Sequence, residues 1–211
     1  MKKVLSLMMA LAICMISSCA MAGNWSVPGP GPSPGPDKFG ERSGARHAVA
    51  GVRTTVLEDD LATRSGPSKE YTGCGTLKNM NGKQAVALAR AVDDGGICWV
   101  EIEVSYHYGA PRRCWVGFQR LSLTGQQLNQ LPYDYEFALG EGIINQYVIP
   151  RMGPGTAYVA NKDYSLTDGT PVAVVASEGD YYLVERRVYG TYENKYLILR
   201  CWVPAQCVTM Q

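Results

Sequence analysis

The tetrapeptide Arg-Cys-Trp-Val stands at residues 113–116, and it occurs again 87 residues later, at 200–203. Other matches recur at the same offset. Arg-Ser-Gly-Pro at 64–67 is followed by Arg-Met-Gly-Pro at 151–154, and Tyr71 is followed by Tyr158. One offset that serves both ends of a segment indicates a duplication. Two copies of this length predict tandem domains and exclude solenoids and propellers, whose repeats are shorter.

Within each copy, apolar and polar residues alternate with the period of a β-strand. In WVEIEV, at 99–104, Val100, Ile102 and Val104 share one face. Its counterpart is YYLVER, at 181–186, where Val-Glu at 184–185 matches Ile-Glu at 102–103 with an offset of 82. Further predicted strands are 84–90, 170–176 and the two tetrapeptides. About five short strands with frequent turns in about 70 residues predict a small barrel, so we expect an all-β protein with two barrels.

The N-terminus has the pattern of an export signal. Lys2 and Lys3 precede an apolar stretch at 4–16, and Ala-Met-Ala at 20–22 is a small-residue cleavage site. The stretch is shorter than the about 20 apolar residues that span a membrane. We therefore predict a signal peptide at 1–22, an exported extracellular or cell-surface protein, and no integral membrane segment in the mature chain.

A second reading of the N-terminus remains open. Ile-Ser-Ser-Cys at 16–19 resembles the lipoprotein box of bacteria, in which Cys19 would become lipidated and anchor the protein.

The rest of the chain divides by composition. Residues 23–50 are dense in proline and glycine, which predicts a disordered spacer. The first barrel is expected at 51–122 and the second, more diverged one at 146–211. The connector, 123–145, is predicted to contain a short helical turn capped at Thr124 and stopped by Pro132.

Five cysteines follow the predicted signal: Cys74, Cys98, Cys114, Cys201 and Cys207. Cys114 and Cys201 occupy equivalent positions of the two copies, and we expect them to be buried thiols rather than a bridge. Cys201 and Cys207 are close enough in sequence for a local disulfide, and they are the pair we predict if any bridge forms.

Charge and residue content exclude several function classes. The 20 Lys and Arg against 19 Asp and Glu argue against a nucleic-acid partner. The two histidines are His47, in the spacer, and His107, near a predicted hairpin tip, so no base is positioned beside a cysteine for nucleophilic catalysis. No Cys-x-x-Cys spacing suggests zinc. We expect no enzyme activity, no catalytic residues, no cofactor and no metal site.

The tetrapeptide itself suggests a binding surface. Because burying an unpaired arginine is prohibitively costly, Arg113 and Arg200 should point outward from the strands. Trp115 and Trp202 then share their outward side, while the cysteines face the core.

The candidate ligand-binding residues follow from this outward face and from the matched tyrosines. They are Trp99, Glu101, Arg113, Trp115, Arg200 and Trp202, together with Tyr71 and Tyr158.

The segment 61–71, LATRSGPSKEY, with Gly-Thr-Leu at 75–77, WVEIE and CWVGFQRL, resembles the bacterial SH3-like (Src-homology-3) domain. The second copy keeps Gly-Pro-Gly-Thr and Trp-Val, but it has Met152 in place of the serine. The resemblance implies an exported accessory module that binds cell-wall peptide or a cell-surface protein without catalysis. The Arg-Ser-Gly-Pro-Ser turn can equally be structural.

Two other functions stay open. One is a structural or scaffolding surface protein with no dedicated ligand. The thiol-dependent cell-wall hydrolase is the least favoured alternative.

Overall fold

The computed structural model describes residues 51–105, 109–134, 138–190 and 193–211. The predicted signal peptide, Cys19, the spacer and both histidines lie outside the described residues. Within them the chain folds into two antiparallel sheets with one short α-helix, which confirms the all-β prediction.

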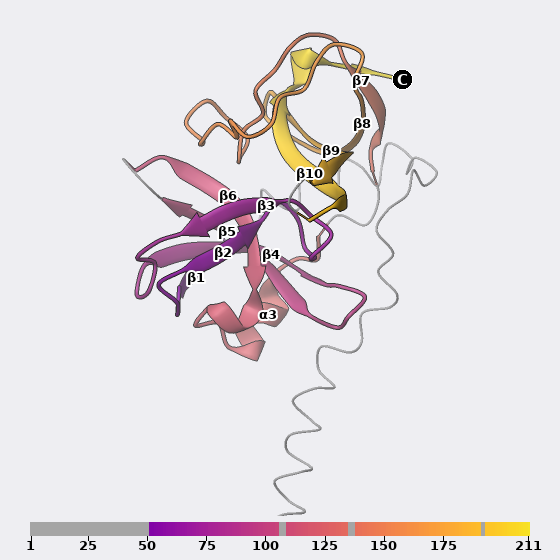
Figure 1. Cartoon of the computed structure of the whole chain (residues 1–211). Coiled ribbons are helices and arrows are strands. Elements are labelled where there is room, and N and C mark those ends of the chain that lie inside the picture. Colours follow the sequence, from indigo (N-terminus) through magenta and orange to yellow (C-terminus); the bar gives the residue numbers. More distant parts are fainter. Residues whose placement is uncertain (1–50, 106–108, 135–137, 191–192) are drawn as a thin grey trace, which may run out of the picture.

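The N-terminal sheet has six strands in the order β1-β4-β5-β6-β2-β3 (Figure 1). These strands are β1 (Val52–Thr55), β2 (Leu61–Arg64), β3 (Gly73–Leu77), β4 (Gln84–Val92), β5 (Cys98–Ser105) and β6 (Pro111–Gly117). The 3-10 helix η1 (Phe118–Arg120) follows β6, and α3 (Gly125–Gln130) follows η1.

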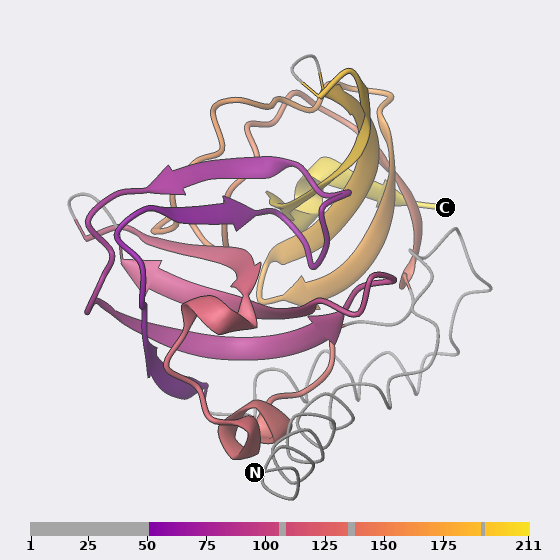
Figure 2. The same ribbon diagram turned by 60° about the horizontal axis from the view of Figure 1, so that its bottom comes forward.

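The C-terminal sheet has five strands in the order β10-β9-β8-β7-β11. They are β7 (Gly140–Ile144), β8 (Pro171–Glu178), β9 (Tyr181–Gly190), β10 (Lys195–Pro204) and β11 (Val208–Met210), with the 3-10 helix η2 (Ala205–Cys207) before the last strand. The two sheets lie side by side in both views (Figures 1 and 2).

The duplication read from the sequence extends to the strand register. Val86 pairs with Glu103 in the N-terminal sheet, and Ala173 pairs with Glu185 in the C-terminal sheet. Each of these strand pairs has a register shift of one residue, between Ala87 and Ala89 and between positions 174 and 176. A β-bulge that recurs at the same offset as the sequence matches is inherited geometry, because bulges persist within families of related folds.

Each sheet has its own apolar core, built from one side of its strands. The N-terminal core includes Val100, Ile102, Cys114 and Val116. The C-terminal core includes Val184, Leu199, Cys201, Val203 and Cys207. The strand alternation therefore predicted the core-facing side correctly, since the cysteine and valine of each tetrapeptide point inward.

The prediction of two closed barrels is not met. The outer strands β1 and β3 do not pair with each other, and neither do β10 and β11. The physical reason is found at β10, whose outer side bonds to residues 70–72 of the N-terminal half and to Arg151 rather than to β11.

The connector differs from its prediction at one end only. Its helical turn forms as expected: Thr124 accepts the backbone N–H of Gln127, and the Gln127 side chain accepts the backbone N–H of Thr124. This capping box satisfies two amides that a helix start leaves without partners. The last part of the predicted connector, however, forms β7, which pairs with β8 and β11.

All five described cysteines are free thiols, so the predicted bridge between Cys201 and Cys207 is not formed. Both side chains are buried in the C-terminal core, and the Cys207 sulfur accepts a hydrogen bond from the Gln146 side chain at 2.9 Å. Cys74 is the one of the five that is not fully buried. Among the described residues, no helix has the length and apolar character needed to cross a lipid bilayer.

Burial predicts how these thiols respond to pH. Burial raises the pKa of Cys114 from 9.0 to about 12, and it raises that of Cys201 as well. We expect both thiols to react slowly with a thiol reagent at pH near 8 and fully after unfolding. Because the folded pKa is raised, the stability linked to these thiols is complete below about pH 9 and is lost as the pH rises toward 12. Thiol titration and denaturant unfolding at several pH values measure both effects. A rapid reaction of Cys114 and Cys201 in the native protein contradicts the buried core.

Candidate functional site

The turn that carries the sequence resemblance is held by its own arginine in both copies. Arg64 Nη1 donates hydrogen bonds to the carbonyl oxygens of Tyr71 at 2.7 Å and Lys69 at 3.3 Å. Arg151 Nη1 donates to the carbonyls of residues 158 and 156, at 2.8 Å and 3.0 Å. The two turns, 64–72 and 151–159, therefore fold in the same way, although their sequences have diverged.

A glycine in each turn makes room for a tyrosine ring. A Cβ atom added at Gly66 would lie 2.1 Å from the ring of Tyr71, and one at Gly153 would lie 1.9 Å from the ring of Tyr158. Tyr71 is fully buried. The glycine of the Gly-Pro pair is therefore required for this close approach and not for an unusual backbone angle.

Each turn bonds to a strand of the other sheet. The Thr72 amide donates to the carbonyl of Ile198 in β10 at 2.9 Å, and the Val159 amide donates to the carbonyl of Pro111 in β6 at 3.1 Å. In the same reciprocal way, the Arg113 amide donates to the Met152 carbonyl at 2.6 Å.

The Arg200 amide, which is equivalent to the Arg113 amide in the second copy, donates a hydrogen bond to the side-chain oxygen of Ser65 at 3.3 Å. We call these two turns, with β6 and β10, the inter-sheet clasp.

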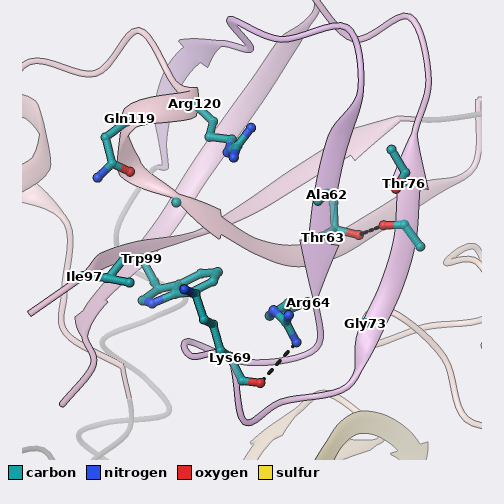
Figure 3. Close-up of a pocket in the computed structure, with 12 residues that line it drawn as sticks. Ala62, Thr63, Arg64, Lys69, Gly73, Thr76, Ile97, Trp99, Gln119 and Arg120 are labelled. Atoms are coloured by element: carbon teal, nitrogen blue, oxygen red, sulfur yellow. Dashed lines mark hydrogen bonds between the residues drawn. The ribbon is translucent and has the colours of Figure 1, made fainter. Parts of the chain in front are cut away.

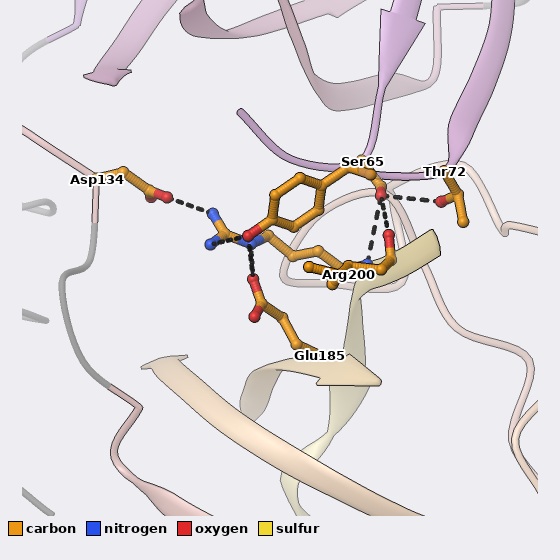
Figure 4. A network of polar contacts seen from close by, with 7 residues as sticks. Ser65, Thr72, Asp134, Glu185 and Arg200 are labelled. Atoms are coloured by element: carbon orange, nitrogen blue, oxygen red, sulfur yellow. Dashed lines mark hydrogen bonds and ion pairs between the residues drawn. The ribbon is translucent and has the colours of Figure 1, made fainter. Parts of the chain in front are cut away.

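Arg200 is the centre of the clasp on one side (Figure 4). Its Nε donates to Glu185 at 2.5 Å, and its Nη1 donates to Asp134 at 2.6 Å. The Tyr71 hydroxyl donates to Glu185 at 3.0 Å. The side chains of Arg200 and Asp134 are each 1% exposed. Burial alone would lower the pKa of Arg200, but Asp134 and Glu185 raise it above its usual value, so the guanidinium stays charged.

Arg113 occupies the equivalent place on the other side. Its Nε donates to Glu103 at 3.0 Å, and Nη1 and Nη2 bond both oxygens of Glu178 in the C-terminal sheet at 2.6 Å and 3.0 Å. The Tyr158 hydroxyl donates to Glu103 at 2.6 Å. Burial and this hydrogen bond raise the pKa of Tyr158 to about 12.

These contacts correct the prediction that the tetrapeptides form an exposed surface. Arg113, Arg200 and their tryptophans do point away from the sheet cores, but they are buried where the two halves meet. Each tryptophan also packs in a small apolar cluster of its own sheet, Trp115 with Ala89 and Ala91, and Trp202 with Val175 and Leu183. Trp115, Trp202 and Glu101 are 1%, 3% and 4% exposed. The arginines tolerate burial because carboxylates pair with them.

A void of about 20 Å³ remains between the two tetrapeptides, with Trp115 and Trp202 among its walls. This is too small to hold even a peptide side chain. Of the eight candidate ligand-binding residues, Tyr71, Glu101, Arg113, Trp115, Tyr158, Arg200 and Trp202 thus lie in or beside the clasp. Trp99 packs with Trp115 in a small apolar cluster on the side of the N-terminal sheet that faces away from its core.

Trp99 lines an open cleft on the N-terminal sheet (Figure 3). The cleft has a volume of about 450 Å³, a size typical of ligand pockets. Three cationic residues line it, Arg64, Lys69 and Arg120, and Gly73, Gly75 and Gly117 leave bare backbone along its wall. We call it the cationic cleft.

Hydrogen bonds fix the groups around the cationic cleft. The Trp99 indole N–H donates to Asp93 at 2.9 Å, and the same carboxylate accepts the backbone amides of residues 95 and 97, which orders the turn between β4 and β5. Thr63 donates to the Gly75 carbonyl at 2.9 Å and ties β2 to β3. The walls are therefore pre-organised, which reduces the entropy lost when a ligand binds.

The charges of the cationic cleft are unbalanced. Its lining contains no acidic residue. Arg120 pairs with Glu58, but the hydrogen bonds of Arg64 go to uncharged carbonyl oxygens. Lys69 is exposed, and no ion pair involving it is found among the described residues.

The C-terminal copy does not reproduce this cleft chemistry. Arg64 has its match in Arg151, but the other wall residues change. At the sequence offsets given above, the positions of Lys69, Gly73, Gly75, Gly117, Arg120 and Trp99 are taken by Thr156, Ala160, Lys162, Pro204, Cys207 and Tyr181. The two copies thus share the residues of the clasp and differ at the cleft.

Sequence reasoning missed most of the polar partners and most of the cleft. Glu103 and Glu185 could have been identified from the sequence, because they match between the two copies. Each lies directly across from the tetrapeptide arginine of its own sheet. Asp134 had no such signal, because its contact joins the connector to β10. For the cleft residues, the only signal in the sequence was that the two copies differ at these positions.

In comparisons with known proteins, no protein-family model matches this chain, and no curated protein sequence matches it.

The close approach of Gly66 to Tyr71 gives a stability prediction. Gly66→Ala should lower the free energy of unfolding by about 1–3 kcal/mol, because the added methyl overlaps a buried ring that has no room to move. Gly73→Ala is the matched control, since a Cβ there meets no atom within 4 Å. It should change stability by less than about 0.5 kcal/mol. Urea denaturation of both variants measures the difference, and equal stabilities would show that the turn does not need glycine.

Proposed function

We propose that this chain is an exported, non-catalytic binding protein that attaches to cell-wall peptide or a cell-surface partner through the cationic cleft. One observation carries the proposal: the cleft is pre-organised and open, and its lining contains cationic residues but no acidic residue. Arg120 pairs with Glu58 and Arg64 holds its turn, whereas the exposed side chain of Lys69 forms no ion pair among the described residues.

Export is supported by the sequence alone. The charged start, the apolar stretch and the small-residue cleavage site direct the chain out of the cytoplasm. Lipidation at Cys19 would retain it at the cell surface, and cleavage after Ala22 would release it.

An SH3-like origin of both halves is part of the same proposal. It is supported by the Arg-Ser-Gly-Pro-Ser turn of the sequence, while the matching strand register and the recurring bulge support the duplication. The binding role implied by that resemblance is retained, but the proposed binding surface differs from the one expected from the sequence. The tetrapeptide face is occupied by the clasp, and the cleft beside Trp99 takes its place.

Blocking the cleft tests this function. Gly73→Leu places a side chain in the open space of the cleft, and the backbone angles of Gly73 are not among the positive φ values that favour glycine. We expect this variant to fold normally and to lose at least about tenfold in affinity for purified cell walls in a sedimentation assay.

The matched control is Ala160→Leu, which changes the equivalent position of the C-terminal sheet, where Arg151 pairs with Ala160 as Arg64 pairs with Gly73. It should bind as the unmodified protein does. Unchanged binding by folded Gly73→Leu would reject the cleft as the binding surface and favour the scaffold alternative.

A further inference from the structure

We infer that the ligand of the cationic cleft is an acidic peptide segment, held in extended form against β2 and β3 with its carboxylates on Arg64 and Lys69. This inference rests on the proposed function and specifies the ligand class.

The charge of the cleft selects an anion. The whole chain has a formal net charge of only +1, and Arg120 is paired with Glu58, so Arg64 and Lys69 in one cleft with no acidic wall residue are a local excess of positive charge. Clefts lined by charges of one sign concentrate ligands of the opposite sign. Arg64 is already oriented by the carbonyls of residues 69 and 71, so it loses little side-chain freedom on binding a carboxylate.

The exposed backbone of the cleft favours a peptide. Gly73 and Gly75 of β3 carry no side chain into the space of the cleft, and an added Cβ at either position meets nothing within 4 Å. An extended segment can approach such bare backbone closely.

Trp99 argues against ligands that bind mainly by stacking. Its side chain is 7% exposed, and its N–H is already bonded to Asp93. Sugars and nucleobases bind aromatic residues through an open ring face. Trp99 presents too little of its surface for that role, and it acts instead as an apolar wall.

Direct titration of the purified mature protein tests the inference without cell walls. The probe is a short glutamate peptide with both ends blocked and a fluorescent label. The comparison probes are the glutamine peptide of the same length and inorganic phosphate as a competitor. We expect the glutamate peptide to bind, with weaker affinity as salt is raised because the contacts are partly exposed to solvent. The glutamine peptide should bind at least about tenfold more weakly.

Charge variants assign the binding to the cleft. Lys69→Gln should lower the affinity for the glutamate peptide at least about threefold. Lys69→Glu should lower it at least about tenfold, because the new carboxylate repels the peptide. Lys162→Gln is the matched control, since it removes an exposed lysine at the position equivalent to Gly75. It should leave the affinity unchanged.

Three outcomes overturn the inference: equal binding of the glutamate and glutamine peptides, an unchanged affinity of Lys69→Glu, or displacement of the peptide by phosphate at lower concentration than by free glutamate peptide. The last result would assign the cleft to a phosphate-bearing polymer. If cell-wall binding is lost in Gly73→Leu but the acidic peptide does not bind, the proposed function stands and the ligand class is wrong. If the peptide binds in the cleft but cell-wall binding is unchanged in Gly73→Leu, the ligand class stands and the cell-wall role is wrong.

Discussion

A guanidinium buried between two sheets, Arg200 against Asp134 and Glu185, is the interaction on which the arrangement of this protein depends. An isolated charge in such a place would be prohibitively costly, so the two halves must meet with their partners correctly placed. Arg113 imposes the same requirement from the other side through Glu103 and Glu178. The backbone hydrogen bonds between the halves then fix the relative positions of the turns and strands. The apolar side of each sheet stabilises its own core, while these buried ion pairs specify how the two sheets are oriented.

The duplication, the strand positions and the core-facing residues could be predicted from the sequence, because each depends on spacing within one copy. The capped turn at Thr124 was predictable for the same reason. The burial of Trp115 and Trp202 was not. Alternation shows that a side chain leaves one core, but it does not show that a second domain covers it. Arg200 was expected in solvent because it has no partner within its tetrapeptide, and its partner Asp134 is 66 residues away in the chain.

The residues of the clasp and of the cationic cleft differ in how well the two copies of the sequence match. Residues that match between the copies, such as the arginine, glycine and tyrosine of each turn, form the clasp. Residues that differ, such as Lys69 against Thr156, line the cleft of one copy alone. A duplicated domain has to keep the contacts that join its halves, while one copy remains free to acquire or lose a binding surface. The distribution of matches therefore separates the residues that join the two halves from those that line the proposed binding cleft.

The central claim is that the two sheets form one cooperative unit joined by the clasp, and native-state hydrogen exchange tests it most directly. The amides of Thr72 and Val159 donate across the sheets, at 2.9 Å and 3.1 Å. The account predicts that both exchange only through global unfolding, with opening free energies equal to those of amides in β5 and β9. Opening free energies lower than those by more than about 2 kcal/mol would contradict it, because the sheets would then separate while each remained folded.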